Sequence, residues 1–127
     1  EGTAQGSIVI DGSLAGLGVV SGPLEVRIEK GLAVGFSGPD AGWLEAKLPS
    51  PEARNVGELG IGTNEKARLI GNLLEDEKVY GTIHVAFGTN ATFGGTVSAG
   101  VHIDGIVLGA TLTVDGRVVV AGGKVVA

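Results

Sequence analysis

The most regular signal along the chain is an alternation of apolar and polar residues with a period of two. Apolar residues alternate with charged ones from Leu24 to Glu29, and the same period continues from Leu32 to Phe36 beyond Gly31. Such alternation is typical of a β-strand with one buried face. The pattern therefore predicts a β-hairpin over residues 24–36.

Three Asp-Gly dipeptides indicate further turns, because this pair favours a two-residue turn with positive φ. The first ends an apolar strand predicted over Ser7–Ile10. The last separates two apolar runs and predicts a second hairpin over residues 111–120. The middle pair, Asp104-Gly105, predicts a third reversal between strands at residues 96–103 and 106–110.

Helical signals are fewer and less regular. Asp76 can cap a helix whose apolar stripe, at spacings of three and four residues, runs as far as Phe87. The competing interpretation is a strand over residues 79–87, because the glycine and threonine within it weaken a helix by up to about 1 kcal/mol each. A capping serine followed by proline predicts a short helix or a single turn over residues 51–55. Residues 35–51 are expected to form an ordered surface segment.

The composition agrees with a β-rich chain. Glycine accounts for 24 of the 127 residues and aromatic residues for 4%, a balance that favours short strands joined by tight turns. We predict an α+β fold, mostly an antiparallel glycine-rich β-sheet or partial barrel with one or two short helices. The length suits a single domain over residues 1–127. The absence of methionine suggests a domain excised from a longer polypeptide.

Charge and hydropathy exclude several classes of partner. The net charge is −5, without a run of Lys or Arg that could follow a phosphate backbone. We therefore expect no nucleic-acid partner. No apolar segment reaches the ~18 residues of a spanning helix, and the first residues do not resemble a signal peptide. With no cysteine, these features predict a cytoplasmic protein that does not bind a membrane.

The candidate chemistry lies in two histidines and two carboxylates. Residues two apart in a strand project to the same face, so His102 and Asp104 can converge on one metal ion. His84 supplies a second imidazole, and Glu58 is a charge within an apolar run that a metal would neutralise. Simpler alternatives stay open: His102 as a surface histidine, Asp104 as a turn residue, and Glu58 paired with a nearby Arg54 or Lys66.

Five short blocks resemble, in order and spacing, the C-terminal half of thermophilic metallo-aminopeptidases of the aminopeptidase T and aminopeptidase S type, which are leucyl aminopeptidase-like. The blocks are residues 55–64, 74–78, 81–88, 93–95 and 102–105.

This resemblance implies a C-terminal metal-binding domain of an aminopeptidase, a protease that hydrolyses N-terminal residues from a peptide substrate. It implies two divalent metal ions (zinc, cobalt or manganese) that activate water. Matched residue by residue, the metal ligands are Glu58, His84, His102 and Asp104, and Glu58 is also the expected catalytic residue. A further glutamate ligand of these peptidases would precede residue 1. Their tyrosine falls at Ala91, and whether Tyr80 replaces it is left open.

The sequence leaves two other functions open. A related branch resembles Fe(II)-dependent dihydroxypyridine dioxygenases, which cleave rings and in which the His102-x-Asp104 element would bind a single Fe(II). Alternatively, the chain is a non-catalytic β-rich dimerisation domain that pairs through apolar edges such as residues 118–120 or 106–108. A homodimer is expected as the oligomeric state.

Overall fold

The computed structural model describes residues 1–126, which form two packed antiparallel sheets and a smaller third one. The first sheet has the strand order β1-β4-β5, and the second has the order β3-β2-β8-β7-β6. The bounds of the first sheet are β1 (Gly6–Ile10), β4 (Leu24–Glu29) and β5 (Leu32–Ser37). Those of the second are β2 (Ser13–Leu14), β3 (Gly18–Val19), β6 (Val56–Ile61), β7 (Ile83–Gly88) and β8 (His102–Val107).

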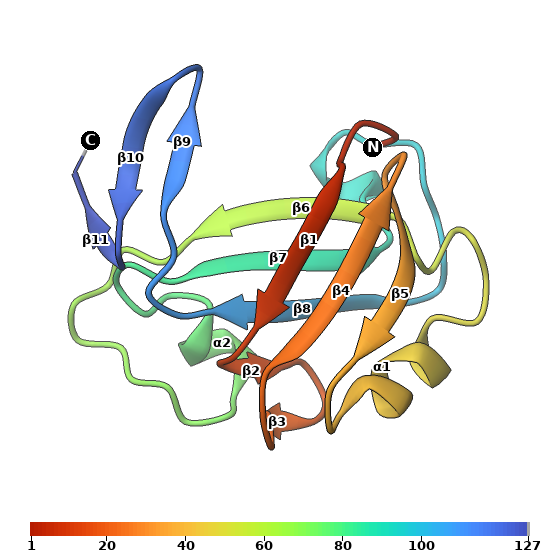
Figure 1. Cartoon of the computed structure of the whole chain (residues 1–127), viewed down its shortest axis with the longest axis horizontal. Coiled ribbons are helices and arrows are strands. Elements are labelled where there is room, and N and C mark those ends of the chain that lie inside the picture. The colour runs from red at the N-terminus through yellow and green to blue at the C-terminus, as the bar shows by residue number, and fades with distance from the viewer. Residues whose placement is uncertain (127) are drawn as a thin grey trace.

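The remaining elements surround these two layers. The third sheet, ordered β11-β10-β9, projects from the body at the C-terminal end (Figure 1). Its bounds are β9 (Leu112–Val114), β10 (Arg117–Ala121) and β11 (Lys124–Val125). The helices are α1 (Ala41–Lys47), α2 (Leu73–Asp76) and the 3-10 turn η1 (Ala91–Phe93).

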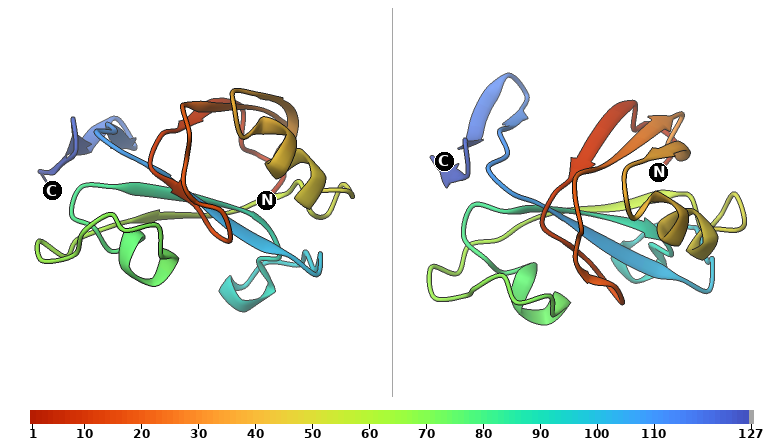
Figure 2. Two further views of the ribbon diagram at one scale, coloured as in Figure 1. Left: turned by 90° about the horizontal axis from the view of Figure 1, so that it is seen from below. Right: turned by 60° about the horizontal axis from the view of Figure 1, so that its bottom comes forward.

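The core lies between the two larger sheets, and the central strands β7 and β8 of the five-stranded sheet contribute alternate residues to it. Figure 2 shows β1, β4, β5 and α1 on one side of the five-stranded sheet, and α2 and η1 on the other. Val85 and Phe87 of β7 and Ile103 of β8 point into the core. Because successive side chains alternate, the residues between them face the side that carries α2 and η1.

The predicted α+β class is confirmed: antiparallel strands dominate, the helices are short, and the described strands close no barrel. The hairpin over residues 24–36 is confirmed as β4 and β5, with Lys30 and Gly31 at positive φ. The C-terminal hairpin is confirmed as β9 and β10, and Asp115 and Gly116 make its turn.

The helix predicted from Asp76 to Phe87 is wrong, and the competing strand over residues 79–87 is confirmed from Ile83 onward. Asp76 ends α2, where its buried carboxylate accepts hydrogen bonds from Ile70 N, Gly71 N and Ser13 Oγ. The following strand, β7, pairs with β6 on one edge and β8 on the other and is buried along its whole length. A strand buried on both faces loses the polar alternation that distinguishes it from a buried helix.

The turn predicted at Asp104-Gly105 is also wrong, because β8 runs straight through this pair. Asp104 faces the side of α2 and η1, while a Cβ on Gly105 would lie 2.5 Å from Ile10 Cδ1 on the core side. Glycine is needed there for close packing between the sheets rather than for a turn. Residues 96–101, predicted as a strand, belong instead to the loop before β8.

The segment between β5 and β6 was predicted in part. It is ordered, as expected, but it contains helix α1, whose Leu44 is fully buried in the core. The short helix or single turn predicted over residues 51–55 is a hydrogen-bonded turn over residues 51–54, where Ser50 Oγ accepts from Ala53 N. Among residues 1–126, no helix is both long and apolar enough to cross a membrane.

Candidate metal centre

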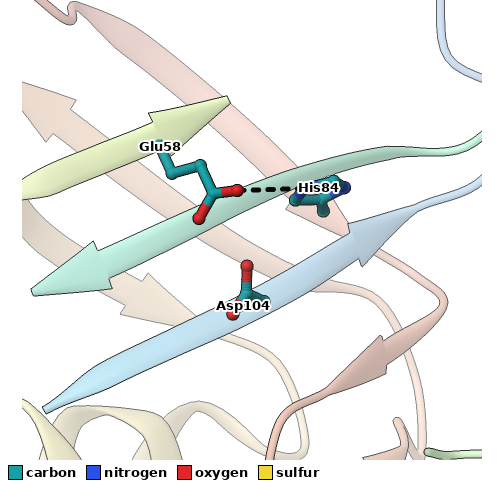
Figure 3. Close-up of side chains that lie close together, drawn as sticks. All are labelled: Glu58, His84 and Asp104. Atoms are coloured by element: carbon teal, nitrogen blue, oxygen red, sulfur yellow. Dashed lines mark hydrogen bonds and ion pairs between the residues drawn. The ribbon is translucent and has the colours of Figure 1, made fainter. Parts of the chain in front are cut away.

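Three adjacent strands bring the four candidate residues to one face of the five-stranded sheet. Glu58 of β6 and Asp104 of β8 both lie opposite Ala86 of β7 in the strand register, so the three residues form one row. His84 lies in the neighbouring row, opposite Gly60, and His102 begins β8. Figure 3 shows Glu58, His84 and Asp104 pointing toward one another from their three strands.

Small residues between the ligands leave the space in which they converge. Ala86 is fully buried and stands between the two carboxylates with only a methyl group. Gly60 lies beneath the His84 ring, and a Cβ on it would lie 2.0 Å from His84 Nε2. One ligand atom each from Glu58, His84 and Asp104 lie within 4.8 Å of one another as a result.

Glu58 connects the two histidines. Its Oε1 lies 3.3 Å from His84 Nε2, and its Oε2 lies 3.0 Å from His102 Nε2. His102 Nε2 also lies 3.3 Å from Asp104 Oδ2. All four residues predicted from the sequence therefore meet in one cluster. The alternative in which Arg54 or Lys66 neutralises Glu58 is not found: within residues 1–126, the ion-pair partners of Glu58 are the two histidines.

The loop before β8 fixes the orientation of His102. The Thr89 carbonyl oxygen lies 2.8 Å from His102 Nδ1. Because a carbonyl only accepts hydrogen bonds, Nδ1 carries the hydrogen in the neutral ring and the Nε2 lone pair faces the carboxylates. A backbone carbonyl on the outer nitrogen is the usual support for a metal-binding histidine. The centroids of the Phe93 and His102 rings lie 5.8 Å apart, with the rings tilted by 33°.

Asp104 is the most buried residue of the cluster, and burial makes its negative charge energetically unfavourable. It is 2% exposed, and its Oδ1 has no hydrogen-bond partner. Burial raises the pKa of Asp104 above its ordinary value, the attraction of His102 opposes this rise, and the nearby Glu58 adds to it. His84 Nδ1 is likewise buried and without a partner. Unpaired buried polar groups are costly, and a cation bound between the carboxylates would compensate the unpaired Asp104 oxygen.

A divalent metal ion fits this donor set. Two imidazoles and two carboxylates provide nitrogen and oxygen ligands of the kind that bind first-row divalent metals. The ion would neutralise both carboxylates and give the unpaired Asp104 oxygen a partner. Glu58, His84 and Asp104 could hold one ion together, and His102 Nε2 lies 3.0 Å from Glu58 Oε2 and 3.3 Å from Asp104 Oδ2, close enough to join them as a ligand.

A pocket of about 330 Å³ opens beside the cluster and shares two of its residues. Glu58 and His84, two of the candidate metal ligands, form one part of its lining. The rest of the wall is made by Ile61, Thr63, Asn64, Glu77 and Lys78.

The sequence did not reveal the residues that position the metal ligands without binding the metal themselves. The glycine-rich run around Glu58 was a usable signal for close approach, but only the strand register shows that Gly60 lies under His84. No sequence signal pointed to the Thr89 carbonyl. Tyr80, whose role was left open, binds Val125 of β11 through its hydroxyl group instead of the cluster.

The comparisons with known proteins identify the family. No curated protein matches the chain. Among solved structures, the 2,5-dihydroxypyridine dioxygenase from Pseudomonas putida KT2440 matches with a TM-score of 0.87 at 24% identity. The match covers 100% of this chain and 41% of that one, so the chain has the fold of part of that enzyme. The sequence model of the 2,5-dihydroxypyridine 5,6-dioxygenase family matches residues 1–127.

These findings overturn the aminopeptidase prediction, including its protease and hydrolase activity. The prediction was wrong because short blocks with histidine and carboxylate ligands on glycine-rich strands suit more than one kind of metalloenzyme. A match over the whole chain also compares the core and loop residues between the blocks. The five blocks alone leave these residues out. The chain belongs to the 2,5-dihydroxypyridine 5,6-dioxygenase family.

Proposed function

We propose that this chain is the metal-binding part of an Fe(II)-dependent dioxygenase that cleaves the ring of a dihydroxylated pyridine. The observation that carries the proposal is the family match over residues 1–127, together with two histidines and two carboxylates on one face of the sheet. Because the chain spans 41% of the solved dioxygenase, the proposed activity is that of the whole protein.

The ligand set supports Fe(II). Two histidines and one carboxylate on one side of a metal are typical of non-haem Fe(II) oxygenases. His84, His102 and Asp104 would supply this arrangement, and Glu58 would be the second carboxylate. When bound, Fe(II) supplies redox chemistry and open positions for a hydroxylated ring and dioxygen.

The residues around the ligands have separate tasks in this proposal. The Thr89 carbonyl keeps the Nε2 lone pair of His102 toward the site. Gly60 leaves room for the His84 ring. Glu58 is 21% exposed at its side chain, compared with 3% for Asp104, and it lines the pocket. It therefore lies where the ligands meet the space available to a substrate.

The test uses the full protein loaded with Fe²⁺ without oxygen and then mixed with 2,5-dihydroxypyridine and ¹⁸O₂. We expect oxygen consumption and a ring-opened product that contains both atoms of one labelled O₂ molecule. A double variant, His84→Ala with His102→Ala, serves as the control and should neither bind Fe²⁺ nor consume oxygen. Stoichiometric Fe²⁺ binding without any oxygen consumption would contradict the proposed function.

The predicted homodimer stays a prediction. Sedimentation of the full protein would test it, because a dimer and a monomer differ twofold in mass.

A further inference from the structure

The pocket beside the cluster has a polar wall formed by residues that are not metal ligands, and the metal site does not explain that wall. Lys78, Asn64 and Thr63 line it together with Glu77. The segment after β6 is attached to Lys78 through the backbone, since Asn64 N donates to the Lys78 carbonyl at 2.8 Å. These residues therefore form one continuous wall.

The Lys78 ammonium group is held in place, and one of its hydrogens is free. Lys78 Nζ donates to the Leu74 carbonyl at 2.5 Å and to Glu77 Oε1 at 3.1 Å. An ammonium group has three N–H donors, so one has no partner within residues 1–126. A side chain held by two hydrogen bonds loses less conformational entropy when it binds a ligand.

The other polar groups of the wall add donors. Asn64 Oδ1 accepts from Lys66 N, so its amide nitrogen supplies the donors that remain. Thr63 contributes a hydroxyl group. The wall thus offers hydrogen-bond donors to a ligand, and Glu58 and His84 of the cluster line the same pocket.

The charge of the wall limits which oxygen it can bind. Glu77 pairs with Lys78 and lies in the same wall, so the local charge is close to neutral. A carboxylate would meet Glu77 and Glu58 and would be repelled. A carbonyl or hydroxyl oxygen on a ring would accept the free hydrogen of Lys78 without this penalty.

We propose that Lys78, assisted by Asn64, binds the oxygen on carbon 2 of the substrate ring while the hydroxyl group on carbon 5 faces the metal ligands. This inference rests on the proposed function and adds the basis of its substrate specificity. Carbons 2 and 5 are on opposite sides of the pyridine ring, so one oxygen can face Glu58 and His84 while the other faces Lys78 in the lining of the same pocket. Lys78 is thereby a specificity-determining residue.

A purely structural role for Lys78 predicts a different behaviour. Its bond to the Leu74 carbonyl closes the end of α2, so its loss could loosen that helix. Loosening would affect all ligands of the pocket alike. Binding of one ring oxygen affects only ligands that carry this oxygen.

The experiment compares two ligands in the full, Fe²⁺-loaded protein by anaerobic calorimetry, so that binding is measured without turnover. The ligands are 2,5-dihydroxypyridine and the analogue without the oxygen on carbon 2, which is 3-hydroxypyridine. We expect Lys78→Met to weaken binding of 2,5-dihydroxypyridine about 10- to 100-fold, as for a lost hydrogen bond to a charged group. The affinity for the analogue should change by less than about twofold.

Lys66→Met is the matched control, because Lys66 is an exposed lysine of the neighbouring loop that does not line the pocket. It should leave both affinities unchanged, and Lys78→Arg should restore part of the lost discrimination. Equal loss of affinity for both ligands in Lys78→Met, or no loss for either, would overturn the inference. Failure of the unmodified protein to bind 2,5-dihydroxypyridine would instead overturn the proposed function, and the inference with it.

Discussion

Single residues without functional groups decide whether the metal ligands can converge. Gly60 has ordinary extended backbone, so a turn or a positive φ does not require glycine at this position. Its importance comes from the His84 ring, which occupies the place of a Cβ. Ala86 has a similar role, because its small methyl group leaves space for the two carboxylates of its row.

Gly60→Ala should therefore move the His84 ring and weaken metal binding. We expect a loss of roughly 10- to 100-fold in metal affinity, similar to that for losing an outer-shell partner, and a stability cost of about 1–3 kcal/mol from overpacking. Metal titration and denaturant unfolding would measure the two effects. His84 and His102 are the only histidines, so NMR of the imidazole nitrogens can show which ring moves.

The control for this variant is Gly42→Ala in α1, where a Cβ would meet nothing within 4 Å. It should leave metal affinity and the imidazole signals unchanged. An unaltered His84 signal in Gly60→Ala would contradict the positioning role of Gly60.

Asp104 should make the metal-free protein less stable as the pH rises. Burial raises its pKa in the folded state above the ordinary value of 3.8, and Glu58 adds to the rise while His102 and His84 oppose it. A group with a raised folded pKa holds its proton more tightly when folded, so its contribution to stability falls as the pH rises from the unfolded pKa through the folded one. Asp104→Asn removes this dependence and should stabilise the metal-free protein at neutral pH.

The same substitution should weaken metal binding by more than roughly 100-fold, because a ligand is lost rather than an outer-shell partner. Metal affinity of the unmodified protein should also rise with pH, since the ligands must be deprotonated. Unfolding curves and metal titrations over a pH series would test how stability and metal affinity change with pH. A less stable metal-free Asp104→Asn protein at neutral pH would show that the buried charge is already compensated.

At the scale of elements, the sequence predicted hairpins well and central strands poorly. The alternation in β4 and β5 and the Asp-Gly turn between β9 and β10 are local, so a short window contains them. The burial of β7 along its whole length depends on its central place between β6 and β8 and on the opposite sheet, which no local window contains. The turn predicted at the Asp-Gly pair in β8 is wrong for the same reason. Its glycine accommodates Ile10 of β1, which is distant in the sequence.

The C-terminal sheet is attached to the body partly through one side chain. Tyr80 Oη accepts from Val125 N at 3.0 Å and donates to the Val125 carbonyl at 3.3 Å. Tyr80→Phe should cost about 1 kcal/mol, as for a typical hydrogen bond, and should speed amide hydrogen exchange in β11. Metal affinity should not change, because Tyr80 does not contact the cluster. Reduced metal affinity with normal exchange in β11 would give Tyr80 a role at the metal site instead.

At the scale of the whole molecule, the candidate metal site joins three strands that are distant in sequence. Glu58, His84 and Asp104 belong to β6, β7 and β8, so a metal that binds only the folded protein links them. Such a ligand stabilises the folded state by about 2.7 kcal/mol when its free concentration is 100 times its dissociation constant. Removal of the metal with a chelator should lower the unfolding temperature accordingly.

The double variant His84→Ala with His102→Ala provides the comparison for this measurement. Its unfolding temperature should be the same with and without metal. A metal-dependent shift that persists in the double variant would place the stabilising ion at another site.

The sequence by itself determined the residue types of the site and the β-rich class. Four candidate ligands were identified from the spacing of His102 and Asp104 and from the blocks around Glu58 and His84, because the period of a strand and the chemistry of a ligand are local properties. The kind of enzyme was misjudged on the same local blocks.

Only the tertiary structure decided how these residues meet. The strand register places the two carboxylates on either side of Ala86, and the loop before β8 places the Thr89 carbonyl on His102. It also creates the pocket in which Lys78 faces the site from another segment. These are contacts between residues distant in the chain, fixed by hydrogen bonding and packing between strands, and a one-residue change of register would turn the ligands to the other face.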